Sequence, residues 1–350
     1  MSMMQTLDYY QIIRQAWEEF DDHHKIKGIY DVSAHVSTNQ VYKVSFHNRK
    51  PVFAKLSDYG RFELFKEDHI IINNLANNLE EPYENFLARS LVKRNELFIY
   101  RYYQQKHSAW VIFYNPIKVK LRLPRRLDEK QIKKMGRELA RFHIACANVS
   151  RQLPIASKSL VTDIHQLIRN INENALVETK EHKKTILEQC DIFLNNADKI
   201  NYLTDLENIP VFVDWNIGNF SVTPEGKFYS RWDYDWFREA NRVMDFYFFS
   251  RVVSDIGDRT VFSYLIDPLM EDRFIMFLKE YHRIYPLTEA EVRMIREIYR
   301  FFILNYVIKD GAYFFREEYA RKLQKEAFEA YLPTIDTHYQ VDKLLKALKL

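Results

Sequence analysis

The spacing of apolar residues divides the chain into a strand-rich first part and a helix-rich second part. Apolar residues recur every three or four positions over residues 5–21 and 61–79, which predicts a helix in each segment. Shorter apolar or alternating runs predict strands, two within residues 28–46 and one each over 51–56, 86–92 and 97–103. Together these segments predict a five-stranded sheet accompanied by helices.

The second part of the chain is dominated by helical spacing. Residues 128–149 form one predicted helix, residues 162–200 form one or two more, and the chain after Asp245 is helical to its end. The exception is residues 211–233, where short apolar runs flank the turn composition of residues 223–226. This segment is therefore predicted to be a loop followed by a β-hairpin.

Composition and charge limit the classes of function. With 350 residues, 47% of them hydrophobic, the chain is long enough for two lobes with a sizeable core. Its 51 basic and 48 acidic residues nearly cancel, which argues against a dedicated nucleic-acid binder. No apolar run approaches the ~20 residues that span a bilayer, and charged residues interrupt the N-terminal segment where a signal peptide is apolar. We expect a cytoplasmic protein whose two cysteines, Cys146 and Cys190, are free thiols.

Three oxygen-bearing side chains gather around the predicted hairpin. Asp214 follows an apolar run, Asn219 comes five residues later, and Asp233 ends the second strand. Carboxylate and amide oxygens suit Mg²⁺, which also takes phosphate oxygens and water. Phosphoryl transfer further needs an Asp that accepts the proton of the attacking hydroxyl. From these residues alone, a hairpin with ordinary polar turn residues remains the alternative.

The segment from 211 to 245 resembles the catalytic core of the aminoglycoside phosphotransferase/choline kinase family, the small-molecule relatives of protein kinases. In that family a loop HGDxHxxN precedes a hairpin ending in IDF or IDW, and a further Asp follows at the start of a helix. Asn219 follows Asp214 by 5 residues, Asp233 follows Asp214 by 19, and Asp245 follows Asp233 by 12. The resemblance implies that Asp214 is the catalytic base, that Asn219 and Asp233 hold Mg²⁺, and that Asp245 braces the catalytic loop.

Two positions depart from the family pattern, and one more extends it. Phe212 and Asn216 stand where the family has its two His residues, and the second of these often lies near the acceptor. Asp233-Tyr234-Asp235 resembles the family's Asp-Trp-Glu, so Asp235 is a further candidate for positioning metal or acceptor. The replacement at Asn216 weakens the inference of a substrate from a single member of the family more than it weakens the inference of phosphoryl transfer.

A second match lies in the predicted helix 128–149. Its segment Met135 to His143, MGRELARFH, resembles the family's L-G-x-x-L-A-x-L-H helix, which packs beneath the catalytic loop. His143 is accordingly expected to be a core residue rather than a catalyst.

The strand-rich part supplies candidates for binding the nucleotide. Lys55 lies inside the apolar run 51–56, where a Lys either snorkels at a sheet edge or, as in kinases, contacts the α- and β-phosphates of ATP. Kinases pair this Lys with a Glu on the following helix. Glu67 is the preferred partner because it fits the family's E-x-x-x-L-x-x-L pattern, and Glu63 is the alternative.

A phosphate-binding turn and a hinge complete the expectations for this part. Ser37, Thr38 and Asn39 form the turn between the first two predicted strands, and their backbone N–H groups are expected to meet the phosphates although the turn contains no Gly. The hinge that meets the adenine is expected near residues 100–104.

The resemblance implies an α+β, two-lobe, protein-kinase-like fold. Its small N-lobe, with a five-stranded antiparallel sheet plus a helix, is expected over residues 1–104, and its larger, mostly helical C-lobe over 105–350. The implied reaction moves the γ-phosphate of ATP, with Mg²⁺, to a hydroxyl of a small choline-, homoserine-, sugar- or aminoglycoside-like molecule. The expected partner is the small-molecule acceptor, and we expect no binding to nucleic acid or to a membrane. The alternative is a catalytically weak or inactive kinase-like protein with a nucleotide-binding or regulatory role.

Overall fold

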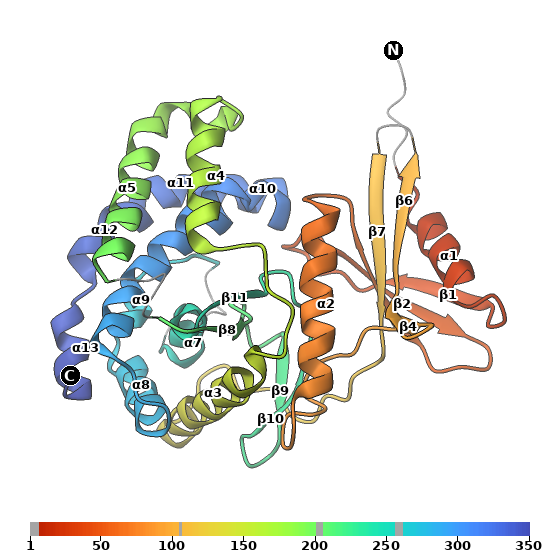
Figure 1. Cartoon of the computed structure of the whole chain (residues 1–350), viewed down its shortest axis with the longest axis horizontal. Coiled ribbons are helices and arrows are strands. Elements are labelled where there is room, and N and C mark those ends of the chain that lie inside the picture. The colour runs from red at the N-terminus through yellow and green to blue at the C-terminus, as the bar shows by residue number, and fades with distance from the viewer. Residues whose placement is uncertain (1–6, 105–106, 201–205, 256–261) are drawn as a thin grey trace.

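The five-stranded sheet forms at one end of the molecule, and helices make up most of the other end (Figure 1). The computed structural model describes residues 7–104, 107–200, 206–255 and 262–350. The strands of the sheet lie in the spatial order β1 (Ile26–Asp31), β2 (Gln40–Phe46), β3 (Val52–Ser57), β7 (His107–Tyr114) and β6 (Ile99–Gln104). Every neighbouring pair is antiparallel. The predicted α+β class and the five-stranded antiparallel sheet are confirmed.

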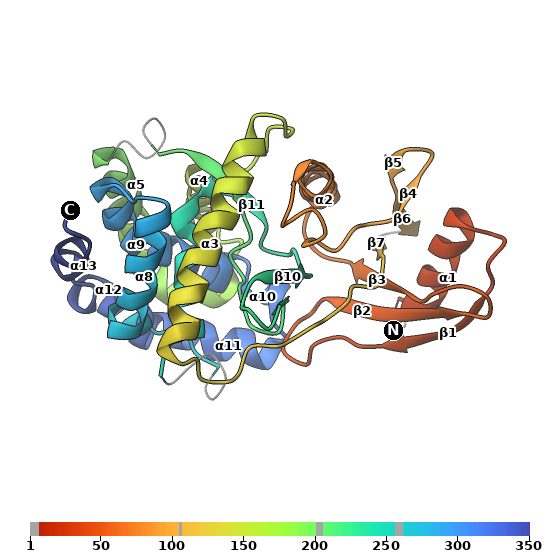
Figure 2. The same cartoon turned by 90° about the horizontal axis from the view of Figure 1, so that it is seen from below.

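The central strand β3 has one apolar face and one polar face. Val52, Ala54 and Leu56 are buried in the apolar cluster beneath α1 (Tyr9–Phe20). Because side chains alternate along a strand, Lys55 points to the opposite face. That face carries α2 (Phe62–Asn78), which stands between the sheet and the C-terminal helices (Figures 1 and 2). The alternation in β3 therefore directs a lysine toward the junction of the two lobes.

One predicted strand of this lobe lies outside the five-stranded sheet, and one strand of the sheet was not predicted. Residues 86–92 do not join the five-stranded sheet: Leu87 forms an isolated bridge with Arg231, and Ser90 forms one with Tyr114. Val92 begins the short strand β4 (Val92–Lys93), which pairs with β5 (Glu96–Leu97) in a separate two-stranded sheet. The fifth strand is instead β7, whose apolar run Ala109–Phe113 the sequence analysis left unassigned. An extended apolar segment looks the same in sequence whether it joins a sheet or packs alone.

This correction also bears on the predicted lobe boundary and hinge. The sheet runs to Tyr114, beyond the predicted end of the N-lobe at residue 104. Residues 100–104, predicted as the hinge, lie in the edge strand β6. The chain leaves the sheet only after β7, and the connection to the helical lobe spans residues 115–128.

The helical lobe is built on α3 (Glu129–Ser150) and α8 (Asp272–Ile284), which lie side by side at the base of the lobe (Figure 1). A Cβ at Gly136 would lie 2.3 Å from the carbonyl oxygen of Phe277, so only glycine permits this close approach. Further α-helices among the described residues are α4 (Leu160–Asn172), α5 (Lys183–Lys199), α7 (Phe246–Val253), α9 (Glu289–Phe302), α10 (Gly311–Phe314), α11 (Glu317–Glu326), α12 (Leu332–His338) and α13 (Val341–Leu348). A π-helix, Ile303–Lys309, continues α9.

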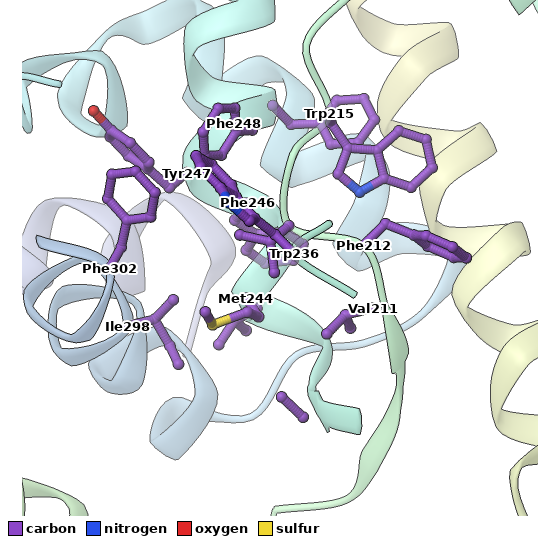
Figure 3. Packing of buried hydrophobic residues seen from close by; sticks show 14 of the residues in the cluster. Val211, Phe212, Trp215, Trp236, Met244, Phe246, Tyr247, Phe248, Ile298 and Phe302 are labelled. Atoms are coloured by element: carbon purple, nitrogen blue, oxygen red, sulfur yellow. The ribbon is translucent and has the colours of Figure 1, made fainter. Parts of the chain in front are cut away.

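The predicted hairpin forms as β9 (Phe220–Val222) paired with β10 (Phe228–Arg231). A second pair, β8 (Asn208–Val211) with β11 (Arg238–Asn241), brackets it in sequence. The segments around both pairs enter the aromatic core of the C-lobe, where Trp236 packs against Phe248 of α7 and Phe302 of α9, and Phe212 and Trp215 lie toward α3 (Figure 3). The apolar core therefore fixes the backbone that carries the candidate residues.

Two smaller expectations are also settled by the described residues. Cys146 and Cys190 are buried free thiols, as predicted. Among the described residues, no helix combines the length and the apolar character needed to cross a membrane.

Candidate active site

The loop that carries Asp214 begins with a strained turn directly after β8. Val213 has φ +59°, a left-handed conformation that is rare for a β-branched residue. Two tight backbone hydrogen bonds accompany it, from Asp214 N to the oxygen of Phe212 at 2.6 Å and from Trp215 N to the oxygen of Val213 at 2.9 Å. Such strain persists only where the surroundings hold it.

A buried carboxylate holds this turn from below. Asp245 Oδ1 accepts hydrogen bonds from the backbone N–H of Phe212 at 3.0 Å and of Val213 at 2.7 Å. Its Oδ2 lies 3.0 Å from His143 Nε2, and His143 Nδ1 lies 2.8 Å from the hydroxyl of Tyr281. Burial lowers the pKa of His143, so its ring is neutral, donates to Asp245 and accepts from Tyr281.

A buried arginine holds the turn from the side of the hairpin. Arg231, the last residue of β10, places its guanidinium 4.7 Å from the ring centre of Phe212 and 4.3 Å from that of Trp215. Its NH2 donates to the backbone oxygen of Asp214 at 2.8 Å. The aromatic ring of Phe212 therefore has a specific partner at the position where the family has His. The sequence analysis missed Arg231, although a charged residue inside an apolar strand was the available signal.

Asp214 and Asn219 are in direct contact. Asp214 Oδ2 accepts a hydrogen bond from Asn219 Nδ2 at 2.9 Å, and Oδ1 accepts one from the backbone N–H of Asn216 at 3.2 Å. The amide nitrogen of Asn219 is thereby turned toward Asp214, and its amide oxygen is turned away from it. Asn216, a candidate for contacting the acceptor, contributes to the loop through its backbone.

The end of the hairpin joins Asp233 to this loop. The backbone N–H of Trp232 donates to the oxygen of Asn219 at 3.0 Å, and Asp233 has φ +67°. Lys55 reaches across from β3, with Nζ 3.4 Å from Asp233 Oδ1 and in contact with Asp235 Oδ1. Although burial alone favours its neutral form, these two carboxylates raise the pKa of Lys55 and keep it charged. Lys55, Asp233 and Asp235 thus meet across the two lobes.

No family model and no curated protein matches this sequence. Solved structures do match it over nearly the whole length of both chains. The amicoumacin kinase hAmiN shares 12% identity at a TM-score of 0.63, covering 97% of each chain. A microcompartment-associated aminopropanol kinase shares 14% identity at 0.57, covering 95% of this chain and 99% of the other. The spectinomycin phosphotransferase APH(9)-Ia shares 14% at 0.51, covering 97% and 98%.

The chain has the fold of the aminoglycoside phosphotransferases and related small-molecule kinases. In this kinase-like fold the turn between β1 and β2 is the segment predicted to meet the phosphates. Asn39 is buried there, donating from Nδ2 to Asp235 Oδ2 and accepting from the Tyr59 hydroxyl and from Ser57 Oγ at 3.3 Å. The structure therefore draws Asn39 into the group around Lys55.

The other two residues of that turn contact the C-lobe. Ser37 forms an antiparallel bridge with Phe315, and Thr38 donates its backbone N–H to the oxygen of Phe314 at 3.3 Å. The ring of Tyr59, just beyond β3, stacks on Tyr313 with centroids 6.0 Å apart and 7° between the planes. These contacts of Tyr59 and of the segment 313–315 were not predicted from the sequence, because contacts between residues so distant in sequence leave no local pattern.

The expected partner of Lys55 on α2 needs correction. Glu67 Oε1 accepts hydrogen bonds from Ser157, at 2.7 Å from its backbone N–H and 3.0 Å from its hydroxyl. Glu63, the alternative, lies 3.8 Å from Arg101. Neither Glu contacts Lys55, because the turn of the helix directs Glu67 toward the C-lobe loop before α4.

The α2 residue whose pKa responds to Lys55 is His69. Burial, and next the charge of Lys55, lower the pKa of His69 to about 3. Its Nδ1 lies 2.8 Å from the oxygen of Phe65, and its Nε2 lies 2.7 Å from the hydroxyl of Tyr114. The ring of His69 is therefore neutral, with both nitrogens engaged.

The residues near Asp233 fit a magnesium ion that is shared with a nucleotide. Within the described ranges, no group of three His, Cys, Asp or Glu side chains forms a metal cluster. Mg²⁺ in nucleotide sites is usually bound by one or two protein groups and otherwise by phosphates and water. The carboxylate of Asp233 and the amide oxygen of Asn219, which is turned away from Asp214, supply two such groups.

Proposed function

We propose that the protein is an ATP- and Mg²⁺-dependent phosphotransferase that moves the γ-phosphate to a hydroxyl of a small molecule. One observation carries the proposal. A carboxylate held on a strained loop, an amide bonded to it, and a lysine paired with carboxylates meet where the two lobes touch. The similar solved structures support it, since they include kinases of amicoumacin and aminopropanol and a phosphotransferase of spectinomycin.

Asp214 is the proposed base. As the acceptor oxygen attacks the γ-phosphorus, the bond from that phosphorus to the bridging oxygen breaks and ADP leaves with the bonding electrons. The acceptor loses its proton to a carboxylate oxygen of Asp214. Asn219 and the N–H of Asn216 hold that carboxylate in one orientation, and Asp245 and Arg231 hold the backbone beneath it. The base is therefore placed before substrate arrives.

Groups on the opposite side of the site are proposed to neutralise the negative charge of the phosphates. Lys55, kept charged by its carboxylate neighbours, is proposed to contact the α- and β-phosphates. Asn219 and Asp233 are proposed to hold the metal. Bound Mg²⁺ supplies neutralisation of phosphate charge. Asn39 is proposed to fix the turn that closes over the phosphates.

The proposed acceptor is a small alcohol. The similar structures include complexes with AMP-PNP, Ca²⁺ and amicoumacin, with ADP and spectinomycin, with streptomycin and ATP, and with gentamicin. These ligands share hydroxyl groups and differ widely in size and charge. The proposal therefore extends over choline-, homoserine-, sugar- and aminoglycoside-like acceptors.

The test is ADP release against a panel of such alcohols, with Asp214→Asn as the decisive variant. At least one acceptor should support turnover, and Asp214→Asn should lower that rate at least about 100-fold, the low end for general-base catalysis. Asp22→Asn, which changes an exposed aspartate, is the matched control and should leave the rate unchanged. A full rate in Asp214→Asn would remove Asp214 from the mechanism.

Thermal stabilisation separates the catalytic proposal from its alternative. A nucleotide-binding protein should be stabilised in proportion to the excess of ATP and Mg²⁺ over their dissociation constant. Stabilisation by ATP without ADP release on any acceptor would identify an inactive, kinase-like nucleotide binder. Absence of both would overturn the proposed function.

A further inference from the structure

The carboxylates of α2 that lie nearest the lobe junction are all engaged away from Lys55. Glu67 bonds to Ser157, and Asp68 Oδ2 accepts from Lys158 at 2.6 Å. Glu63 lies beside Arg101 on the exposed side of the helix. The lysine that is proposed to bind phosphate therefore needs another group to set its direction.

We infer that Asp235 is the positioning residue that orients Lys55 in place of a helix carboxylate. This inference rests on the proposed function, because it assigns a role within the same nucleotide site. Lys55 Nζ contacts Asp235 Oδ1, whereas its distance to Asp233 Oδ1 is 3.4 Å. The position that resembles the third residue of the family's Asp-Trp-Glu thus faces the lysine.

Both oxygens of Asp235 are occupied by groups from the N-lobe. Oδ1 contacts Lys55, and Oδ2 accepts a hydrogen bond from Asn39 Nδ2. Asn39 is held in turn through its Oδ1, which accepts from Tyr59 and Ser57. A lysine side chain has a flexible four-carbon stem, so a carboxylate fixed at both oxygens restricts the direction of its ammonium group. Asp235 therefore has the contacts that a positioning residue requires.

Burial strengthens the assignment. Lys55 is only 5% exposed, and a buried ammonium group without a partner is strongly unfavourable. The side chain of Asp233 is 40% exposed and that of Asp235 is 18% exposed. The more exposed carboxylate is the one available to a metal, and the more buried one is matched to the lysine.

The arrangement places the lysine and the metal ligand on one turn. The backbone N–H of Asp235 donates to Asp233 Oδ1 at 3.3 Å, so the two carboxylates are fixed relative to each other. Where a Glu on a helix orients the lysine, the direction of the lysine depends on the position of that helix. Here it depends on contact between β3 and the C-lobe hairpin, so approach of the lobes orients Lys55 directly.

A double-mutant cycle on ADP affinity tests the assignment without turnover. ADP binding is measured by calorimetry in EDTA and in Mg²⁺ for the wild type, Lys55→Met, Asp235→Asn and the double variant. In EDTA, Lys55→Met should weaken ADP binding about tenfold in the wild type, as expected for a charge-assisted contact, and less than about threefold when Asp235 is already Asn. An equal or larger loss in the Asp235→Asn background would overturn the inference.

Matched variants separate this role from metal binding. Asp233→Asn should reduce the gain in ADP affinity that Mg²⁺ gives, whereas Asp235→Asn should leave that gain within about twofold. Glu67→Gln should leave ADP affinity unchanged with or without Mg²⁺. A loss of the Mg²⁺ gain in Asp235→Asn would make Asp235 a metal ligand and overturn the assignment.

If a variant fails to fold, a crystal structure of the wild type with AMP-PNP and Mg²⁺ tests the inference instead. Asp235 should lie within hydrogen-bond distance of Lys55 while the lysine contacts phosphate. An Asp235 oxygen at about 2.0–2.1 Å from the metal, with Lys55 released, would overturn it. A wild type that binds neither ADP nor AMP-PNP would overturn the proposed function itself. Nucleotide binding without the coupling between Lys55 and Asp235 would remove only the role of Asp235.

Discussion

The two halves of the candidate site are supported in different ways. Beneath Asp214, the support consists of Asp245, His143 and Arg231, which are buried in the C-lobe core. Around Lys55, the support joins Asn39 of the N-lobe to Asp235 of the C-lobe across the junction of the two lobes. The first support exists within one lobe, and the second exists only while the lobes touch. Under the proposed function, this difference predicts a preformed base and a phosphate side that is completed by contact between the lobes.

Removal of the Asp245 carboxylate should have the largest effect on the support beneath Asp214. Asp245→Ala leaves two backbone N–H groups and His143 without their acceptor in a buried site. We expect a loss of about 3–5 kcal/mol in the free energy of unfolding, measured by urea titration, because breaking a buried charged network leaves its partners uncompensated. Activity should fall with it, since the turn at Val213 loses the group that holds it.

Asp245→Asn is the matched control for that experiment. Its amide oxygen still accepts from the backbone of Phe212 and Val213, and His143 can exchange its tautomer to accept from the new amide nitrogen. The loss of stability should therefore be clearly smaller than for Asp245→Ala. Equal losses in the two variants would show that charge, and not hydrogen bonding to the loop, is what Asp245 supplies.

The pH dependence of stability tests the side around Lys55. The pKa of His69 is lowered to about 3 in the folded protein, whereas an unfolded histidine titrates near its ordinary value of 6.5. Below pH 6.5 the unfolded chain therefore binds a proton that the folded chain does not, and stability falls as the pH falls toward 3. Each pH unit in this window removes about 1.4 kcal/mol through this residue.

The measurement compares His69→Gln with the wild type between pH 7 and pH 5. The loss of unfolding free energy over this range should be smaller in the variant by about 2 kcal/mol. His23→Gln, which changes an exposed histidine, should leave the slope unaltered. An unaltered slope in His69→Gln would mean that the ring becomes protonated in the folded state.

The two supports also differ in how far the sequence predicted them. Asp214, Asn219 and Asp233 lie within one hairpin unit, so their spacing was enough to place them together. Asp245 was expected beneath the loop through its resemblance to the family, and the structure places it there. Arg231 went unnoticed although it is a charged residue inside an apolar strand, because its partners, two ring faces and a backbone oxygen, leave no pattern of spacing.

The second support depends on contacts between distant segments and was predicted less well. Asn39 was expected near the phosphates, but its bond to Asp235 spans 196 residues of sequence. Glu67 was chosen by pattern, yet the direction of a helical side chain depends on the rotation of the helix about its axis, which packing decides. The strand β7 was missed for a similar reason, since its place in the sheet is set by its partners β3 and β6.

The smallest expected effect comes from loosening the contact between the lobes. Tyr313→Ala removes the ring that stacks on Tyr59, and aromatic pairs contribute about 0.5–1.5 kcal/mol beyond their buried area. Tyr10→Ala is a matched control, because Tyr10 is 47% exposed against 48% for Tyr313 and its ring contacts Tyr42 within the N-lobe. Both variants should lose about 1 kcal/mol of stability. Only Tyr313→Ala should also raise the KM for ATP, by roughly threefold, because only its partner lies across the lobes. If both variants raised that KM equally, the effect would come from general loosening of the N-lobe, and the phosphate side would not depend on contact between the lobes.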